Sequence, residues 1–249
     1  MAHLTKHTFV CLDLETTGLD CKQDRIIELA VAKFTFDGVL EGFETLINPE
    51  IPIPQESVAI HHITQEMIQD KPTIREILAT LLDFIGDLPI VGHGIPFDIN
   101  MIKASAERLQ LTSTIHKNLF FDTLRLARLY GRSPTNSLEM LRQHFNIQEE
   151  GAHRAMSDVV VNIQVFKHLT STFTTLEDVV KALSKPIQMK HMPLGKHKGR
   201  EMKELPLQYL FWAAKQEFDE DLLFTIRSEI GRRKKGATFG QAVNPFMTL

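Results

Sequence analysis

The stretch Phe9-Val10-Cys11-Leu12-Asp13-Leu14-Glu15-Thr16-Thr17-Gly18 decides the fold of the chain. Apart from Asp13, residues 9–14 are apolar on both faces of a strand, which predicts a central strand of a sheet. The Glu-Thr-Thr-Gly that follows is typical of a turn. Side chains two positions apart on a strand leave the same face, so Asp13 and Glu15 bring two carboxylates together at the strand end.

Two further strands are expected next, over residues 25–36 and 39–47. The loops between the three strands are short and contain glycine, which indicates antiparallel hairpins. The prolines Pro49, Pro52 and Pro54 then indicate an extended connector.

From Thr73 onward, helices and short strands alternate. Ile74, Ile77, Leu78, Leu81, Leu82 and Ile85 share one helical face, and Pro96 suits the first position of a second helix. Three strands followed by alternating helices and strands predict an α/β domain with a mixed sheet. The remaining expected elements are strands at 88–91 and 120–122 and helices at 123–130, 137–145 and 154–169.

The Thr/Ser-rich stretch 170–175 indicates a domain boundary. We expect one domain over residues 1–170, a linker over 171–186 with a short helix (176–183) capped by Thr175, and a small C-terminal module over 187–249. The module is expected to be α+β or mostly helical, with helices near residues 206–218 and 221–232.

The composition is that of an ordinary globular protein with an uneven charge distribution. The net charge is −3 overall, but −7 over residues 1–170 and +4 over residues 171–249. Such a division fits an acidic metal site beside an appendage that attracts phosphate, and it equally fits solvated surfaces that differ by chance. Two cysteines offer neither a disulfide framework nor zinc spacing, and no run of about 18 apolar residues is present. We therefore expect a cytoplasmic protein that does not bind a membrane.

Three acidic elements stand far apart in the sequence. Two carboxylates at Asp13 and Glu15 are costly beside a sheet core unless cations or protons neutralise them. Asp98 lies in the first turn of a helix that follows a strand, a common location for sites in α/β sheets. His153 and Asp158 are about 140° apart around a helix, so they can share a site only if His153 precedes the helix. Each element taken alone also has an ordinary structural explanation.

Together these elements resemble the three motifs of the DEDD superfamily of 3′–5′ exonucleases, in its histidine-containing (DEDDh, DnaQ-like) subclass. The matching motifs are Leu12-Asp13-Leu14-Glu15-Thr16-Thr17-Gly18, Gly92-His93-Gly94-Ile95-Pro96-Phe97-Asp98 and His153-Arg154-Ala155-Met156-Ser157-Asp158. Supporting matches are Arg25-Ile26-Ile27-Glu28, Ile60-His61-His62-Ile63-Thr64 and Phe121-Asp122-Thr123-Leu124. Gly94 departs from the pattern, since many relatives have Asn there, and Val159 replaces a frequent Ala.

The resemblance implies a ribonuclease H-like five-stranded sheet flanked by helices and a two-metal mechanism. Asp13, Glu15, Asp98 and Asp158 would bind two Mg²⁺ or Mn²⁺ ions, and His153 would be the general base. It also implies that Glu56 and His61 contact the 3′-terminal nucleotide. The turn residues Thr16, Thr17, Gly18 and Leu19 would hold the 3′ end.

The C-terminal module resembles that of exonuclease X-like proteins, through Met192–Gly199 and Tyr209–Trp212. Its Lys/Gly loop is either a phosphate-binding element or a solvated turn, and the helical spacing of Tyr209, Phe211 and Trp212 favours core packing. Residues 241–246 weakly resemble a sliding-clamp-binding peptide.

The sequence therefore predicts a 3′–5′ exonuclease that hydrolyses single-stranded DNA ends to nucleoside 5′-monophosphates in proofreading or repair. A DNA polymerase subunit and the sliding clamp are the candidate protein partners. Two alternatives stay open: an exoribonuclease that trims RNA, and a non-catalytic module that binds nucleic acid or a polymerase.

Overall fold

The computed structural model describes residues 3–130, 136–148 and 155–242, with side chains as far as Lys235. The chain divides into two compact units. Unit 1 comprises residues 1–126 and 137–180, and unit 2 comprises residues 127–136 and 181–249. The domain boundaries expected from the sequence stay a prediction.

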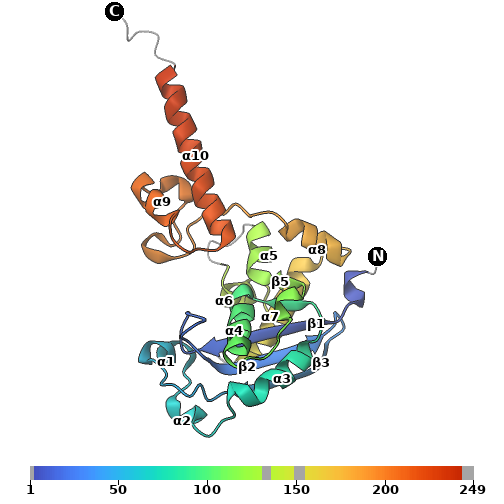
Figure 1. Cartoon of the computed structure of the whole chain (residues 1–249). Helices are drawn as coiled ribbons and strands as arrows, with labels where there is room; N and C mark the ends of the chain where they lie inside the picture. Colours follow the sequence, from blue (N-terminus) through green and yellow to red (C-terminus); the bar gives the residue numbers. More distant parts are fainter. Residues whose placement is uncertain (1–2, 131–135, 149–154, 243–249) are drawn as a thin grey trace, which may run out of the picture. The chain divides into compact units, whose positions relative to one another are not determined.

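Unit 1 is built on a five-stranded mixed sheet in the order β3-β2-β1-β4-β5 (Figure 1). The central strand β1 (Phe9–Thr16) pairs antiparallel with β2 (Ile26–Phe34) and parallel with β4 (Ile90–Gly92). At the edges, β3 (Val39–Leu46) is antiparallel to β2, and β5 (Phe120–Asp122) is parallel to β4. The predicted mixed five-stranded sheet is confirmed.

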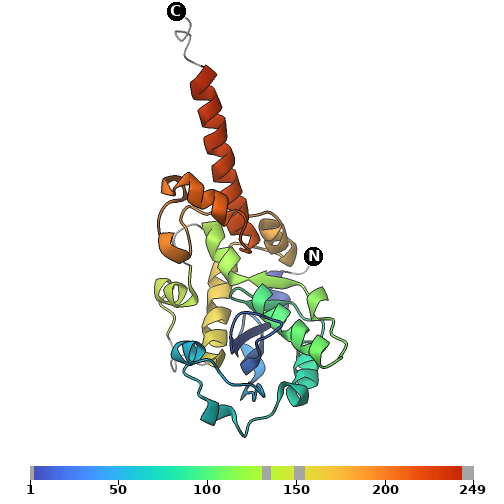
Figure 2. The ribbon, with the colours of Figure 1, turned by 60° about the vertical axis from the view of Figure 1, so that its left-hand side comes forward.

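Helices cover both faces of this sheet (Figure 2). The helix α7 (Ala155–Thr170) lies on one face, and α3 (Ile74–Ile85) and α4 (Pro96–Arg108) lie on the other. The even residues of β1 join the core beneath α3 and α4, whereas the odd residues face α7. The Phe9 ring, for example, lies 5.2 Å from the Phe166 ring of α7. Asp13 and Glu15 continue this odd series, so the strand alternation directs them to the α7 face.

The three prolines predict an extended connector after β3, and this prediction is only partly right. The connector contains the short helices α1 (Gln55–His61) and α2 (Gln65–Ile68). Pro54 stands immediately before α1, where a fixed φ near −60° and a missing N–H do not interrupt helical hydrogen bonding. Further along the chain, α5 (Thr123–Tyr130), α6 (Leu138–His144) and α8 (Leu176–Leu183) form as expected, and Thr175 caps α8 through Asp178.

Unit 2 has its own apolar core around α9 (Leu207–Ala213) and α10 (Glu220–Ala242). The first helix ends earlier and the second ends later than the sequence indicated. In α9, turn-type bonds from Lys215 to Trp212 and from Gln216 to Ala213 close the last turn. Among the described residues, no helix combines the length and apolar character needed to cross a membrane. The core residues are Met192, Met202, Leu205, Leu210, Ala213, Leu222, Ile226 and Ile230.

A buried ion-pair cluster joins the two sequence segments of unit 2. The Arg128 guanidinium donates to Asp219 Oδ1 at 2.7 Å and to Asp221 Oδ2 at 2.9 Å. The side chains of Arg128 and Asp221 are 6% and 1% exposed, and Asp221 also accepts a hydrogen bond from the Ile187 amide. Removing one partner would leave a buried charge without compensation, which is far more costly than losing a surface pair.

We therefore expect Arg128→Met to lower the free energy of unfolding of unit 2 by about 3–5 kcal/mol. The single tryptophan, Trp212, lies in unit 2, so its fluorescence during urea denaturation reports this transition. The matched control is Arg232→Met, because the Arg232 side chain is 64% exposed and Glu229 keeps Arg233 as a partner. Equal midpoints for the two variants would contradict the prediction.

Candidate active site

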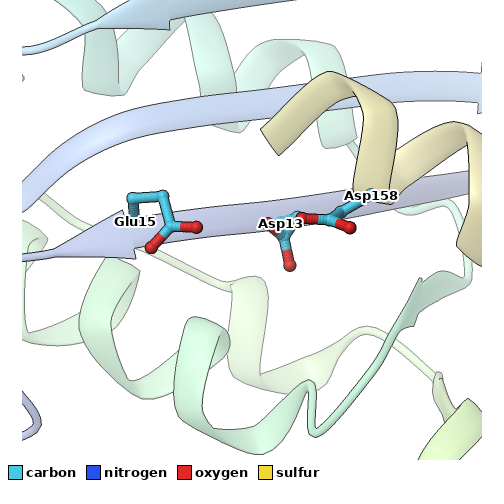
Figure 3. Close-up of side chains that lie close together, drawn as sticks. All are labelled: Asp13, Glu15 and Asp158. Carbon is cyan, nitrogen blue, oxygen red and sulfur yellow. The ribbon is translucent and has the colours of Figure 1, made fainter. Parts of the chain in front are cut away.

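Three carboxylates from two distant parts of unit 1 meet at the end of β1. One ligand atom each from Asp13, Glu15 and Asp158 lie within 4.8 Å of one another. In Figure 3, Asp13 and Glu15 project from β1, and Asp158 reaches the same point from the start of α7. The spacing suits the coordination of a cation by carboxylate oxygens.

Asp98 adds a fourth carboxylate from α4. It is buried in the first turn of that helix. Its carboxyl group lies close enough to Asp13 and Glu15 of β1 to interact with both electrostatically. Burial raises the pKa of Asp98, the negative charges of Asp122 and Glu15 raise it further, and the backbone hydrogen bonds oppose the shift.

The four acids repel one another electrostatically. Burial raises the pKa of Asp13 well above its usual range, and the charges of Asp98, Asp158 and Glu15 add to this effect. The pKa of Glu15 rises to about 7, first because of burial and then because of Asp158 and Glu28. When carboxylates hold protons near neutral pH, a bound cation would stabilise their ionised form strongly.

Glu28 and Asp122 belong to the site's structure, although the sequence predicts no role for either residue. Glu28 is 1% exposed, lies opposite Glu15 in the β1–β2 register, and accepts a bond from the Ala155 amide at the start of α7. Asp122 accepts bonds from the Gly94 and Leu124 amides, both at 2.9 Å. Both residues lie within the supporting motif matches, Arg25–Glu28 and Phe121–Leu124. Only the strand register and these hydrogen bonds place them beside the site.

The conformation of Gly94 gives a physical reason for its departure from the family pattern. Its φ is +75°, a left-handed conformation that glycine adopts freely and asparagine tolerates better than most residues. The substitution therefore preserves the turn that leads into α4 and Asp98.

The turn after β1 contains Thr16, Thr17, Gly18 and Leu19. The Thr17 hydroxyl donates to Asp24 Oδ1 at 2.9 Å, and a Cβ on Gly18 would come within 2.5 Å of Asp24 Oδ2. Thr16 donates to the Gly18 carbonyl. Leu19 is 84% exposed, so this fixed turn presents a large apolar side chain to solvent.

Helix α1 contributes Glu56 and His61. The Ser57 hydroxyl donates to the Thr17 carbonyl at 2.7 Å and so ties α1 to the turn. Glu56 is exposed, whereas His61 is 5% exposed and accepts a bond at Nδ1 from the Ile63 amide. Burial lowers the pKa of His61, which favours the neutral ring, although Glu28 opposes this. A neutral ring that accepts at Nδ1 carries its proton on Nε2. Nε2 has no hydrogen-bond partner among the described residues.

His153 lies outside the described residues. The structure does describe Asp158, inside α7, and Ala155, the first residue of that helix. The sequence prediction that His153 precedes the helix stays a prediction.

A five-stranded mixed sheet flanked by helices, with four convergent carboxylates at the end of its central strand, defines a protein of ribonuclease H-like fold. Solved structures support this fold. Exonuclease X in complex with 5′ overhanging duplex DNA aligns with a TM-score of 0.57 and 24% identity, over 70% of this chain and 98% of that one. E. coli Exonuclease I in complex with a dA16 oligonucleotide aligns with a TM-score of 0.61 and 22% identity, over 68% and 42%.

The sequence comparisons identify the family. The model of the RNase_T exonuclease family matches residues 10–166. The DNA polymerase III subunit epsilon of Aquifex aeolicus is 33% identical over 66% of this chain and 81% of its own length. A PolC-type DNA polymerase III from Clostridium perfringens is 30% identical over 84% of the chain, although the match spans only 14% of that relative. The chain belongs to the family of DnaQ-like 3′–5′ exonucleases.

A second family model matches residues 180–225, most of the described part of unit 2. It is described as a putative quorum-sensing-regulated virulence factor. This part of the chain therefore has relatives of its own.

The raised carboxyl pKa values predict how the metal-free protein depends on pH. Between about pH 4.5 and 7 folded Glu15 holds more proton than unfolded Glu15, so the free energy of unfolding falls as the pH rises. At pH 8 in a chelator, Asp13→Asn should relieve repulsion and raise the melting temperature, by roughly 2–4 °C for each kcal/mol regained.

Thermal unfolding followed by circular dichroism measures this effect. The control is Asp83→Asn, which changes an exposed carboxylate of α3 by the same chemistry. A melting temperature that Asp13→Asn lowers, or raises no more than the control does, would contradict electrostatic repulsion at the site.

Proposed function

We propose that this chain is a metal-dependent exonuclease that hydrolyses single-stranded DNA from the 3′ end and releases nucleoside 5′-monophosphates. The observation that carries the proposal is the convergence of Asp13, Glu15, Asp98 and Asp158 at one end of β1. The family of the chain supports the same chemistry.

The proposed cofactors are two divalent cations, Mg²⁺ or Mn²⁺, which these four carboxylates would hold. Hard cations prefer carboxylate oxygens, and the donor set contains no described cysteine or histidine that would favour a softer metal. The raised pKa values fit this assignment, because positive charge would offset the repulsion that protons otherwise relieve. When bound, such ions supply Lewis-acid stabilisation of the charge on phosphate oxygens.

The protein's own residues would position the strand end and move the proton. Leu19, exposed on its fixed turn, offers an apolar surface for the terminal base, and the free Nε2–H of His61 offers a hydrogen-bond donor. Glu56 and the turn residues Thr16, Thr17 and Gly18 would complete the contacts. His153 would take the proton of the attacking water, a role that an imidazole with a pKa near 6.5 can fill at neutral pH.

Single-stranded DNA is favoured as substrate and a replicative polymerase as partner because of the relatives' names. One relative is a DNA polymerase III subunit, and similar folds have been solved with DNA. A sliding clamp is the other candidate partner, through residues 241–246. Of that peptide, Gln241 and Ala242 end helix α10, and the rest lies outside the described residues.

The activity is tested with a 5′-labelled single-stranded DNA oligonucleotide and a matched RNA. EDTA should abolish stepwise shortening from the 3′ end, and Mg²⁺ or Mn²⁺ should restore it, because the carboxylates alone cannot neutralise phosphate charge. Asp13→Ala should lose nearly all activity, whereas the control Asp83→Ala should retain it. Activity that survives thorough chelation would rule out the metal-dependent reaction, and faster shortening of RNA would identify an exoribonuclease instead.

The general base is tested by His153→Ala. We expect the rate to fall about 10²–10⁴-fold while Mg²⁺ still raises the melting temperature, since His153 is not a proposed ligand. His116→Ala removes an exposed histidine and serves as the control. A rate within twofold of the wild type would overturn the assignment of His153. No nuclease activity in the wild type with either metal would favour the non-catalytic binding module.

A further inference from the structure

A structured loop in unit 2 presents three cations to solvent. The Met192 amide donates to the Arg200 carbonyl at 2.9 Å, and the Gly199 amide donates back to the Met192 carbonyl at 2.7 Å. Gly195 and Gly199 adopt positive φ values of +69° and +82°, which close the loop tightly. Lys196, Lys198 and Arg200 are all exposed on it.

An aromatic row continues from this loop onto α9. The His197 ring lies 4.4 Å from the Tyr209 ring, and the Tyr209 ring lies 5.4 Å from the Trp212 ring. Trp212 and Phe211 are 53% and 40% exposed, so the core packing expected from the helical spacing is wrong for both. Tyr209 is partly buried and does pack against the core of unit 2. The core side of α9 is instead formed by Leu210 and Ala213, both fully buried.

The charge around this aromatic row is positive. Residues 181–249 contain 13 lysines and arginines against 7 aspartates and glutamates, and residues 194–200 contain three cations and no acid. The Lys196 ammonium lies 5.5 Å from the centre of the Tyr209 ring. The nearest acid in sequence, Glu201, is already paired with Lys203 at 2.6 Å and Lys190 at 3.6 Å.

We propose that residues 194–200 together with Tyr209 and Trp212 form a second nucleic-acid-binding surface, which takes a single strand. Bases would stack on the exposed Trp212 ring, and the phosphates would lie against Lys196, Lys198 and Arg200. A duplex keeps its base faces stacked inside and cannot use the ring, and an acidic peptide would use the cations but leave the ring without a partner. The proposal does not rest on the nuclease activity, since it uses none of the carboxylates of unit 1.

Trp212 is the only tryptophan in the chain, so its fluorescence reports binding directly. The full chain is titrated in EDTA, which prevents cleavage, with a dT16 oligonucleotide, a blunt duplex and poly-glutamate at equal ionic strength. Stacking on the indole should quench the emission with the single strand and with neither of the other two. Equal quenching by poly-glutamate would mean that the Trp212 emission responds to negative charge alone, and it would overturn the proposal.

A variant pair separates stacking from general stability. Trp212→Ala should weaken binding of the same oligonucleotide, measured by fluorescence anisotropy, by about tenfold or more. Phe211→Ala is the matched control, because Phe211 is 40% exposed on the same helix but packs against Lys234 rather than Tyr209. Trp212→Phe keeps an aromatic ring and should retain most of the affinity. Lys196→Gln should reduce the slope of log affinity against log salt by about 0.7.

The two proposals fail in different ways. If the oligonucleotide raises the anisotropy, the emission of Trp212 does not change and Trp212→Ala binds like the wild type, the strand is held elsewhere and this surface is ruled out. The nuclease assays with Asp13→Ala are unaffected by that outcome. If those assays fail while Trp212 is quenched, the surface stands without the nuclease.

Discussion

Electrostatic repulsion among the acids at the end of β1 is the constraint on which the rest of the structure depends. Asp13, Glu15, Asp98 and Asp158 come from three distant parts of the chain, and burial together with neighbouring negative charges raises the pKa values of Asp13, Glu15 and Asp98. The folded state can hold such groups together only if other interactions offset the free-energy cost of their burial and repulsion. The offset comes from the apolar core of unit 1, in which Val10, Leu12 and Leu14 of β1 are buried on the opposite face. Sites of this kind lower the free energy of unfolding, because their side chains are arranged for activity rather than for stability.

Buried hydrogen bonds fix where each acid stands. Glu28 accepts from the first amide of α7, which sets the start of the helix that carries Asp158. Asp122 accepts from Gly94, which sets the turn before α4 and Asp98. The Thr123 hydroxyl donates to Asn162 of α7 at 2.6 Å and lies 3.0 Å from His93 Nδ1. These bonds hold the second motif and the start of α7 in place through side chains that are themselves not proposed ligands.

Features that a single element encodes could be predicted from the sequence. The apolar run of β1, the hairpins and Pro96 at the start of α4 depend on local pattern alone, and the structure has all three. The convergence of the acids was predicted only through the resemblance of three motifs to a family, because no local pattern brings residues 13, 98 and 158 together. The role of Glu28 needed the strand register, which depends on contacts between distant residues. Helical spacing could not tell whether Trp212 faces the core or solvent, since Leu210 and Ala213 satisfy the same periodicity.

The proposed second surface would give the uneven charge of the chain a function in holding a strand. Nucleic acid is a polyanion, and a cluster of carboxylates repels it until cations are bound. Basic residues elsewhere in the chain can supply attraction that the acidic site cannot, and residues 181–249 carry a net charge of +6. An enzyme that removes every nucleotide in turn also has to accept every base. Stacking on a ring meets that need, because all four bases have an aromatic face, whereas hydrogen bonds to base edges would favour one sequence over another.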